Sequence, residues 1–289
     1  MRVFVTGVTG QVGSEIVNEL HRRAAERVRG PALDVVAPEE SALDITDRDA
    51  LLAAISTVEP EVIIHPAAFT AVDACEGDPD RAFLINSLGT RHIAEAARLV
   101  GAHVCYLSPD YVFDGTSPRP YLEWDDPNPL SVYGRSKLGG ERELDDGHTI
   151  VRTAWVNGRS GANMVKTVLR LATAGETLRF VDDQRGSPTS AADLASRVID
   201  LSLGKHPGIF HVTNQGATSW YEFARLVVGA AGMDPSRVEP ISTADLVPPR
   251  PAPRPANSVL DNAALRLSGW NLLPSWEQAI TGLVTELMA

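Results

Sequence analysis

Cysteine and long apolar runs are both scarce in this chain of 289 residues. Only Cys75 and Cys105 occur, each within an apolar stretch, which excludes a disulfide framework and a cysteine-rich zinc site. No apolar run approaches the ~20 residues that a membrane-spanning helix needs. The first residues read as a strand rather than as the apolar core of a signal peptide. We therefore expect a cytoplasmic protein without membrane interactions.

Basic residues are in the minority. The chain has 26 Lys and Arg against 37 Asp and Glu, which gives a net charge of -11. A surface this acidic has no general attraction for phosphate backbones, so we do not expect nucleic acid as a partner. With 44% hydrophobic residues the chain can bury a sizeable core, and a globular enzyme or binding protein remains.

The N-terminal half alternates short apolar segments with helical patterns. After Gly13, the apolar residues Ile16, Val17, Leu20, Ala24 and Val28 recur with helical spacing. Strands are expected at residues 2–6, 33–37, 61–68, 103–107 and 149–156, and helices at 47–58 and 79–100. This alternation predicts βαβ units and an α/β fold of the Rossmann type, with a doubly wound parallel sheet covered on both faces.

The second half is less regular. We expect helices at residues 162–174, 191–203, 220–232, 262–268 and 275–288, and strands at 177–181 and 208–212. Residues 248–255 (PPRPAPRP) predict an extended connector packed on the surface, and an SH3-type ligand is the alternative. We assign 1–156 mainly to cofactor binding, with 182–204 and 212–240 partly returning to it. Residues 157–181, 205–211 and 241–289 form a smaller, discontinuous substrate-binding part.

Three glycines stand between the first strand and the first helix. In the segment 7–13 (GVTGQVG), Gly7 permits a tight turn, Gly10 lets the backbone approach a pyrophosphate, and Gly13 allows close contact between helix and strand. The free N–H groups and the positive dipole end of the following helix favour phosphate. The alternative is that the glycines only form a turn. Their strand–turn–helix context favours binding of a nicotinamide dinucleotide.

The end of the second strand usually selects between NAD and NADP. Residues 37–43 contain no arginine, and Glu39 would repel a 2′-phosphate. We therefore expect NADH to be used at least comparably to NADPH. Asp44 and Asp47 follow this segment. For both residues, capping of a helix is the alternative to contact with the cofactor.

Tyr133 and Lys137 are spaced i and i+4. On a helix they share one face and can reach the same ligand. A phenol with a pKa near ~10 is a poor acid or base near neutrality, and an adjacent ammonium favours its ionised form. The alternative is a solvated helical face. The placement of the pair downstream of the glycine segment predicts a catalytic tyrosine and lysine.

These motifs resemble the extended short-chain dehydrogenase/reductase superfamily and, within it, the dTDP-4-dehydrorhamnose reductase family. The resemblance covers nearly the whole chain. It rests on residues 7–13, 67–73, 107–115 (LSPDYVFDG), 133–137, 151–156, 181–189 and 253–261.

The resemblance implies roles for individual residues. Tyr133 would donate the proton and Lys137 would assist it, with Ser108 as a further catalytic hydroxyl. Residues implied to contact the cofactor are Gly7, Gly10, Gln11, Val12, Gly13, Asp44, Ile45, Ala67, Ala68, Phe69, Thr70, Tyr133 and Lys137. Ser108, Asp110 and Trp155 would contact the sugar nucleotide. Alternatively, Ala68 packs in a strand, Asp110 is a turn residue and Trp155 is a core aromatic.

Pro109 departs from the family pattern. The family usually has a threonine there, whose hydroxyl bonds the substrate ketone, and proline supplies neither a hydroxyl nor an N–H. Ser108 is adjacent, although neighbouring strand residues face opposite ways. The family is also associated with magnesium at a dimer contact, so a homodimer and a magnesium ion are both allowed. Glu15 would suit such a site, but no metal ligand is assigned.

The resemblance implies transfer of hydride from NADH or NADPH to the C4 ketone of a dTDP-4-keto-6-deoxy-L-sugar, with dTDP-4-dehydrorhamnose as the expected substrate. One alternative is a 4-ketoreductase for another nucleotide deoxysugar. The other is a non-catalytic NAD(P)-binding subunit, such as the regulatory β subunit of methionine adenosyltransferase, which resembles this family. Tyr133 and Lys137 favour an enzyme, whereas Pro109 favours a binding subunit.

Overall fold

Six parallel strands form the central sheet of the computed structural model, which describes residues 1–26, 32–175 and 177–289. The strand order is β10-β5-β4-β3-β1-β2. Apolar, largely β-branched segments form these strands, as expected for a sheet buried on both faces. They are β1 (Arg2–Val5), β2 (Asp34–Val36), β3 (Val62–His65), β4 (His103–Pro109), β5 (Thr149–Thr153) and β10 (Gly208–His211).

Helices cover both faces of the sheet, which confirms the doubly wound α/β fold. Val3 and Val5 point to the face covered by α1 (Gln11–Ala25) and α8 (Ala191–Leu203). Phe4 and Ile63 point to the opposite face, covered by α2 (Arg48–Val58) and α5 (Gly89–Val100). Because side chains alternate along a strand, one short strand contributes to two cores.

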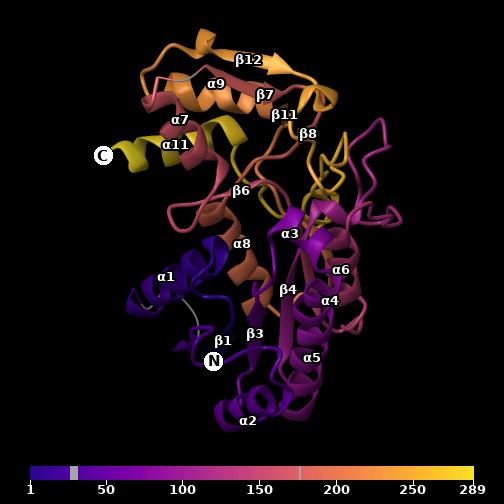
Figure 1. The fold of residues 1–289 in the computed structure, drawn as a ribbon. Coiled ribbons are helices and arrows are strands. Elements are labelled where there is room, and N and C mark those ends of the chain that lie inside the picture. Colours follow the sequence, from indigo (N-terminus) through magenta and orange to yellow (C-terminus); the bar gives the residue numbers. More distant parts are fainter. Residues whose placement is uncertain (27–31, 176) are drawn as a thin grey trace.

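A second lobe lies beyond the carboxyl ends of the strands (Figure 1). Its core lies among α7 (Met164–Thr173), α9 (Trp220–Ala230) and α11 (Trp276–Met288), with the parallel pair β7 (Leu178–Val181) and β12 (Val238–Ile241). Two further pairs are β6 (Val156–Asn157) with β9 (Thr189–Ser190), and β8 (Arg185–Gly186) with β11 (Thr218–Ser219). The lobe therefore assembles segments that are far apart in the sequence.

Two parts of the expected division of the chain are corrected. Strand β10, in the segment 205–211, belongs to the central sheet because it pairs with β5. Helix α9, in the segment 212–240, packs in the second lobe because Phe223 and Val227 face α7 and α11. Within 241–289, α10 (Ala263–Leu267) packs on β10, so this segment contributes to both lobes.

The helix expected at 79–100 is divided into α4 (Pro79–Phe83), a π-helical segment (Leu84–Leu88) and α5. The remaining elements are α3 (Val72–Gly77), α6 (Val132–Glu141) and three 3₁₀ turns, Asp110–Val112, Pro235–Arg237 and Thr243–Asp245. Val28, expected on the first helix, lies outside the described residues. Within the described ranges, no helix is long and apolar enough to cross a membrane.

Candidate functional site

The three glycines form a tight turn between β1 and α1. Gly7 has a φ of +57°, and a Cβ there would lie 2.7 Å from the Cα and N of Ala67. A Cβ on Gly13 would lie 2.0 Å from the Gly7 carbonyl oxygen. Gly10 precedes α1 without a side-chain cap, so the N–H groups of the first helical turn lack intrahelical acceptors. This geometry fits a dinucleotide pyrophosphate, whose charge the helix N-terminus favours.

We expect replacement of Gly10 by valine to weaken binding of NAD(P)H by about tenfold or more, or about 1.4 kcal/mol or more. A Cβ at Gly10 approaches only the Gly7 carbonyl oxygen, at 3.3 Å, so the fold tolerates it while the branched side chain occupies the outer face of the turn. Fluorescence titration measures the dissociation constant. Gly77→Val is the control, since a Cβ there meets nothing within 4 Å. Unchanged affinity in the Gly10 variant would contradict this assignment.

Ala67, Ala68, Phe69 and Thr70 lie in a loop after β3. The strand expected at 61–68 ends at His65, so Ala67 and Ala68 are not part of it. The side chain of Asn86 holds this loop. The Phe69 N–H donates to Asn86 Oδ1 at 2.8 Å, and Asn86 Nδ2 donates to the Phe69 carbonyl and to Ser136 Oγ. Asn86 is buried in the π-helical segment and ties the loop to α6. Sequence analysis missed this residue, and a polar side chain inside an otherwise apolar helical run was the available signal.

Asp44 and Ile45 lie between β2 and α2. Asp44 Oδ1 accepts from the N–H and the hydroxyl of Thr46, both at 2.8 Å, so this carboxylate forms a local turn. Ile45 is buried, and its carbonyl lies 3.1 Å from Nδ1 of His92. Asp47 caps α2 by accepting from the Ala50 N–H, which confirms the capping alternative for that residue.

Tyr133 and Lys137 lie one turn apart on α6, and both side chains are buried. The hydroxyl of Ser131 caps this helix by accepting from the Gly134 N–H. Lys137 Nζ lies over the ring of Tyr106, 4.0 Å from its centroid. The structure therefore supports the expectation that the two residues share one helical face.

The pKa of Tyr133 differs from the expectation. It is raised above its usual range, because the side chain is buried and because the negative charge of Asp110 disfavours the phenolate. Burial lowers the pKa of Lys137 to about 7, against the opposing effect of Glu141. The predicted lowering of the Tyr133 pKa by an ammonium is therefore not found. Tyr133 is held protonated, which is the form that a proton donor needs.

Ser108 does not offer the free catalytic hydroxyl that was expected. Its Oγ donates a short hydrogen bond to Oε1 of Glu141, on the side of the sheet that α6 covers. Glu141 also forms a two-pronged ion pair with Arg152, at 2.7 Å and 3.0 Å. All three side chains are buried. Ser108 therefore belongs to a buried polar cluster, defined here as Ser108, Glu141 and Arg152.

Asp110 begins the 3₁₀ turn directly after β4. Its side chain is 2% exposed, and Oδ2 has no hydrogen-bond partner among the described residues. Burial raises the pKa of this carboxyl to about 7, although hydrogen bonding by Ser258 and by the N–H groups of Asp110 and Tyr111 opposes the shift. Asp110 is thus a carboxyl group that holds a proton near neutrality.

The proline-rich segment 248–255 packs beside this region as an extended connector, as expected. Asp73 on α3 accepts from the Ala252 N–H at 3.1 Å and from Arg254 Nη2 at 2.8 Å. Arg250 lies 3.6 Å from the same carboxylate. These contacts hold the segment against α3, a pairing that no motif in the sequence indicates.

Trp155 connects the two lobes. It follows β5 with a φ of +44°, and its ring stacks on Trp220 of α9 with centroids 3.6 Å apart and an interplanar angle of 5°. A Cβ on Gly186 would lie 2.3 Å from the indole, so this glycine makes room for the ring. The indole is half-buried, which leaves part of its surface accessible.

The described residues do not fit a magnesium ion at Glu15. Its carboxylate is buried and forms a two-pronged ion pair with Arg159, at 2.8 Å and 3.0 Å. The described parts of the chain contain no group of three or more His, Cys, Asp or Glu side chains that could hold a metal ion. The guanidinium supplies the positive charge that this carboxylate needs.

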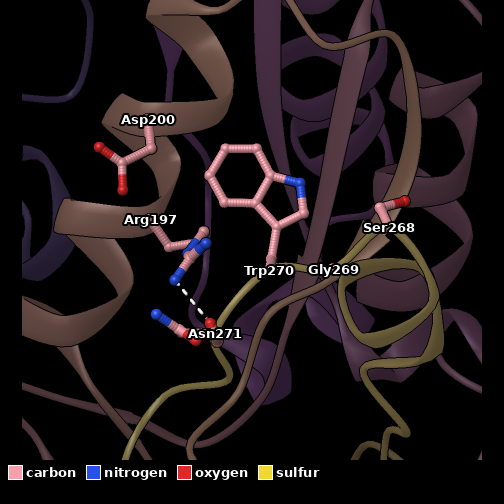
Figure 2. Close-up of a pocket in the computed structure, with 6 residues that line it drawn as sticks. All are labelled: Arg197, Asp200, Ser268, Gly269, Trp270 and Asn271. Atoms are coloured by element: carbon pink, nitrogen blue, oxygen red, sulfur yellow. Dashed lines mark hydrogen bonds between the residues drawn. The ribbon is translucent and has the colours of Figure 1, made fainter.

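A surface pocket between α8 and residues 268–271 is shown in Figure 2. Arg197 donates to the Asn271 carbonyl at 2.7 Å and lies 4.8 Å from the ring centroid of Trp270. None of the expected site residues lines this pocket. Its arginine acts as a structural anchor between α8 and the loop after α10.

Comparison with known proteins gives consistent matches over the whole chain. A family model described as RmlD substrate binding domain matches residues 1–289. A dTDP-4-dehydrorhamnose reductase of Streptomyces griseus is 42% identical, with 97% of this chain and 92% of that protein covered. A dTDP-4-keto-6-deoxy-D-glucose reductase of Streptomyces niveus is 38% identical, with 97% and 95% covered.

A solved structure shows the same fold. It is the dTDP-4-dehydrorhamnose reductase of Bacillus anthracis in complex with NADP, with a TM-score of 0.90 and 38% sequence identity. The similarity covers 99% of both chains. The two-lobed arrangement is therefore that of a solved, cofactor-bound relative.

Proposed function

Because the chain belongs to the RmlD substrate binding domain family and is an NAD(P)-dependent oxidoreductase of the dTDP-sugar 4-ketoreductase type, we propose that it reduces dTDP-4-dehydrorhamnose to dTDP-L-rhamnose. The ketone at C4 of this 6-deoxy-L-sugar would be the reacting group. The observation that carries the proposal is the buried pair Tyr133 and Lys137 on one face of α6, with Tyr133 held protonated.

The chain's own residues would bind and orient the cofactor and the sugar nucleotide, and would protonate the ketone oxygen. When bound, the reduced nicotinamide supplies the hydride. Tyr133 donates its proton to the ketone oxygen as negative charge develops there. Lys137, with a pKa of about 7, stands one turn away and both orients the ribose and returns a proton to the tyrosine.

The cofactor would lie across the carboxyl ends of the strands, where ligands of open α/β sheets bind. The glycine turn between β1 and α1 and the loop after β3 approach each other at Gly7 and Ala67. We assign the pyrophosphate and ribose to these two segments and the adenine to the turn before α2. The proposed cofactor residues are Gly7, Gly10, Gln11, Val12, Gly13, Asp44, Ile45, Ala67, Ala68, Phe69, Thr70, Tyr133 and Lys137.

The sugar nucleotide would lie between the lobes. Asp110 is at the end of β4 in the sheet lobe, and Trp155 stacks on a helix of the second lobe. A half-buried indole offers an apolar face for a sugar or a base. Asp110 and Trp155 are therefore the proposed substrate contacts.

A second candidate substrate is a different dTDP-linked deoxysugar. The Streptomyces niveus relative, described as a dTDP-4-keto-6-deoxy-D-glucose reductase, favours it at 38% identity. Oxidation of NADH and NADPH, measured with dTDP-4-dehydrorhamnose and with dTDP-4-keto-6-deoxy-D-glucose, distinguishes the two. We expect a higher kcat/KM with the first sugar. A higher value with the second would transfer the assignment to it.

We expect NADH to support turnover at least as well as NADPH. Glu39 is exposed just after β2, and its negative charge would oppose a 2′-phosphate. The ratio of kcat/KM for the two cofactors at one substrate concentration measures the preference. A large preference for NADPH would contradict this expectation and would require a basic residue from elsewhere in the fold.

A further inference from the structure

The carboxyl end of β4 provides no free donor from the two residues that end the strand. Pro109 has neither an N–H nor a hydroxyl. The hydroxyl of Ser108 is committed to Glu141 inside the buried polar cluster. A ketone oxygen that gains negative charge during reduction is stabilised by hydrogen-bond donors aimed at it. Tyr133 is one such donor, and the neighbouring strand end supplies none.

Asp110, the next residue along the chain, can supply the missing hydrogen-bond donor. Its Oδ2 is buried and unpartnered within the described ranges, and burial of a polar atom without a partner is costly. The carboxyl group is close enough to Tyr133 that its ionisation would raise the pKa of that phenol. The turn that Asp110 begins also packs against α6. An unsatisfied polar atom next to the proton donor points to a group on the substrate.

We propose that Asp110 retains its proton and donates a hydrogen bond from its carboxyl group to the substrate ketone oxygen, beside Tyr133. This inference rests on the proposed function. The reduction adds hydride to the carbonyl carbon and the Tyr133 proton to the oxygen, so the C=O π bond becomes C–H and O–H bonds. Asp110 keeps its own proton throughout and stabilises the developing charge.

The surroundings of Asp110 are consistent with a neutral acid. Tyr133 and Lys137 lie on α6, against which the turn of Asp110 packs, Tyr111 adjoins Asp110 on that turn, and Cys75 lies on α3 near Tyr133. Arg254 of the proline-rich segment acts on Tyr111 and pairs with Asp73. Among the described residues, no cation forms an ion pair with Asp110. Burial therefore dominates, and the pKa of about 7 leaves the group mostly protonated at pH 6.

The test compares kcat/KM of the full-length protein and of Asp110→Asn between pH 6 and pH 8, because kcat/KM reports the pKa values of the free enzyme. With a pKa of about 7, the protonated fraction falls about tenfold over this range, whereas an amide keeps its donor. We expect the ratio of variant to wild-type kcat/KM to rise about tenfold. Ionisation of Lys137 is common to both proteins and cancels in the ratio. Asp114→Asn is the control, since hydrogen bonds from Thr116, Asn128 and Tyr121 lower the pKa of Asp114 and keep it ionised. Its ratio is expected to stay flat.

Comparison of Asp110→Ala with Asp110→Asn separates the hydrogen-bond donor from the carboxyl charge. Alanine removes both, and loss of an oxyanion donor costs about 10²-fold in kcat. We expect that loss at pH 6, and a smaller loss with Asp110→Asn, whose amide still supplies a donor. A second readout needs no activity: the infrared spectrum at pH 6 is expected to contain a carboxylic-acid carbonyl band that is absent from Asp110→Asn.

The possible results support or overturn the proposed role of Asp110 as a hydrogen-bond donor. Three results would overturn it in a protein that still reduces the sugar. They are a variant-to-wild-type activity ratio that does not change between pH 6 and pH 8, equal activity of the Ala and Asn variants, and the absence of a carboxylic-acid band. A wild type that reduces no keto sugar would instead refute the proposed function. A wild-type kcat that rises from pH 6 to pH 8 while Asp110→Asn is inactive would show that Asp110 acts as an ionised acceptor.

Discussion

Replacement of Tyr133 by phenylalanine is expected to lower kcat by about 10²–10⁴-fold, the range that general acid catalysis contributes. The phenyl ring fills the same buried space, and the structure gives the Tyr133 hydroxyl no role in holding α6, which Ser131 caps. Cofactor affinity is therefore expected to change little. Steady-state oxidation of NAD(P)H and fluorescence titration together separate the two effects.

Tyr221→Phe is the matched control for this variant. Tyr221 lies on α9, half-buried against the core of the second lobe and away from β4 and α6. Its loss of a hydroxyl should leave kcat unchanged. Equal activity of the Tyr133 variant and the wild type would mean that another group donates the proton.

Arg152→Met is expected to lower the free energy of unfolding by about 3–5 kcal/mol, the cost of leaving one member of a buried ion pair without its partner. Arg152 is 2% exposed, holds Glu141 with two hydrogen bonds, and lies 5.2 Å from the ring centroid of Phe113. Methionine keeps most of the side-chain volume but leaves the Glu141 carboxylate buried and uncompensated. Urea denaturation measures the change.

Two further variants test the electrostatic origin of this loss. Arg91→Met breaks the exposed pair with Glu143, where solvent screens the charges, and little change is expected. Glu141→Leu combined with Arg152→Met removes both buried charges and should recover most of the stability. If the double variant is as unstable as Arg152→Met alone, the loss comes from packing rather than from the unpaired charge.

Much of the sheet could be predicted because each strand is an apolar run ended by a turn residue or a polar segment. The sheet that the strand at 208–211 joins could not be predicted, since a strand of four residues does not specify its partner. Pairing with β5 decides it. Similarly, the amphipathic helix α9 indicates one apolar face but not the lobe that covers it. The assignment of segments to the two lobes depends on pairing between residues far apart in the sequence, and local patterns do not predict that pairing.

The shared helical face of Tyr133 and Lys137 was predictable because the two residues lie within one helical turn, where spacing alone fixes it. The hydrogen bond of the Ser108 hydroxyl was not predictable. It depends on a strand register that places Ser108 beside Arg152 and on a glutamate 33 residues away. The pKa of Tyr133 was predicted in the wrong direction. Burial and the charge of Asp110 set it, and neither can be read from the spacing of two residues.

Under the proposed function, hydride is transferred to C4 of a dTDP-linked 4-keto-6-deoxy-L-sugar. Incubation of dTDP-4-dehydrorhamnose with NAD(P)H carrying deuterium at the transferable position of the nicotinamide, followed by NMR of the sugar product, tests it most directly. We expect the wild type to form dTDP-L-rhamnose with a single deuterium at C4, and Tyr133→Phe to lose this product. Unreacted sugar, or a product without deuterium at C4, would contradict it.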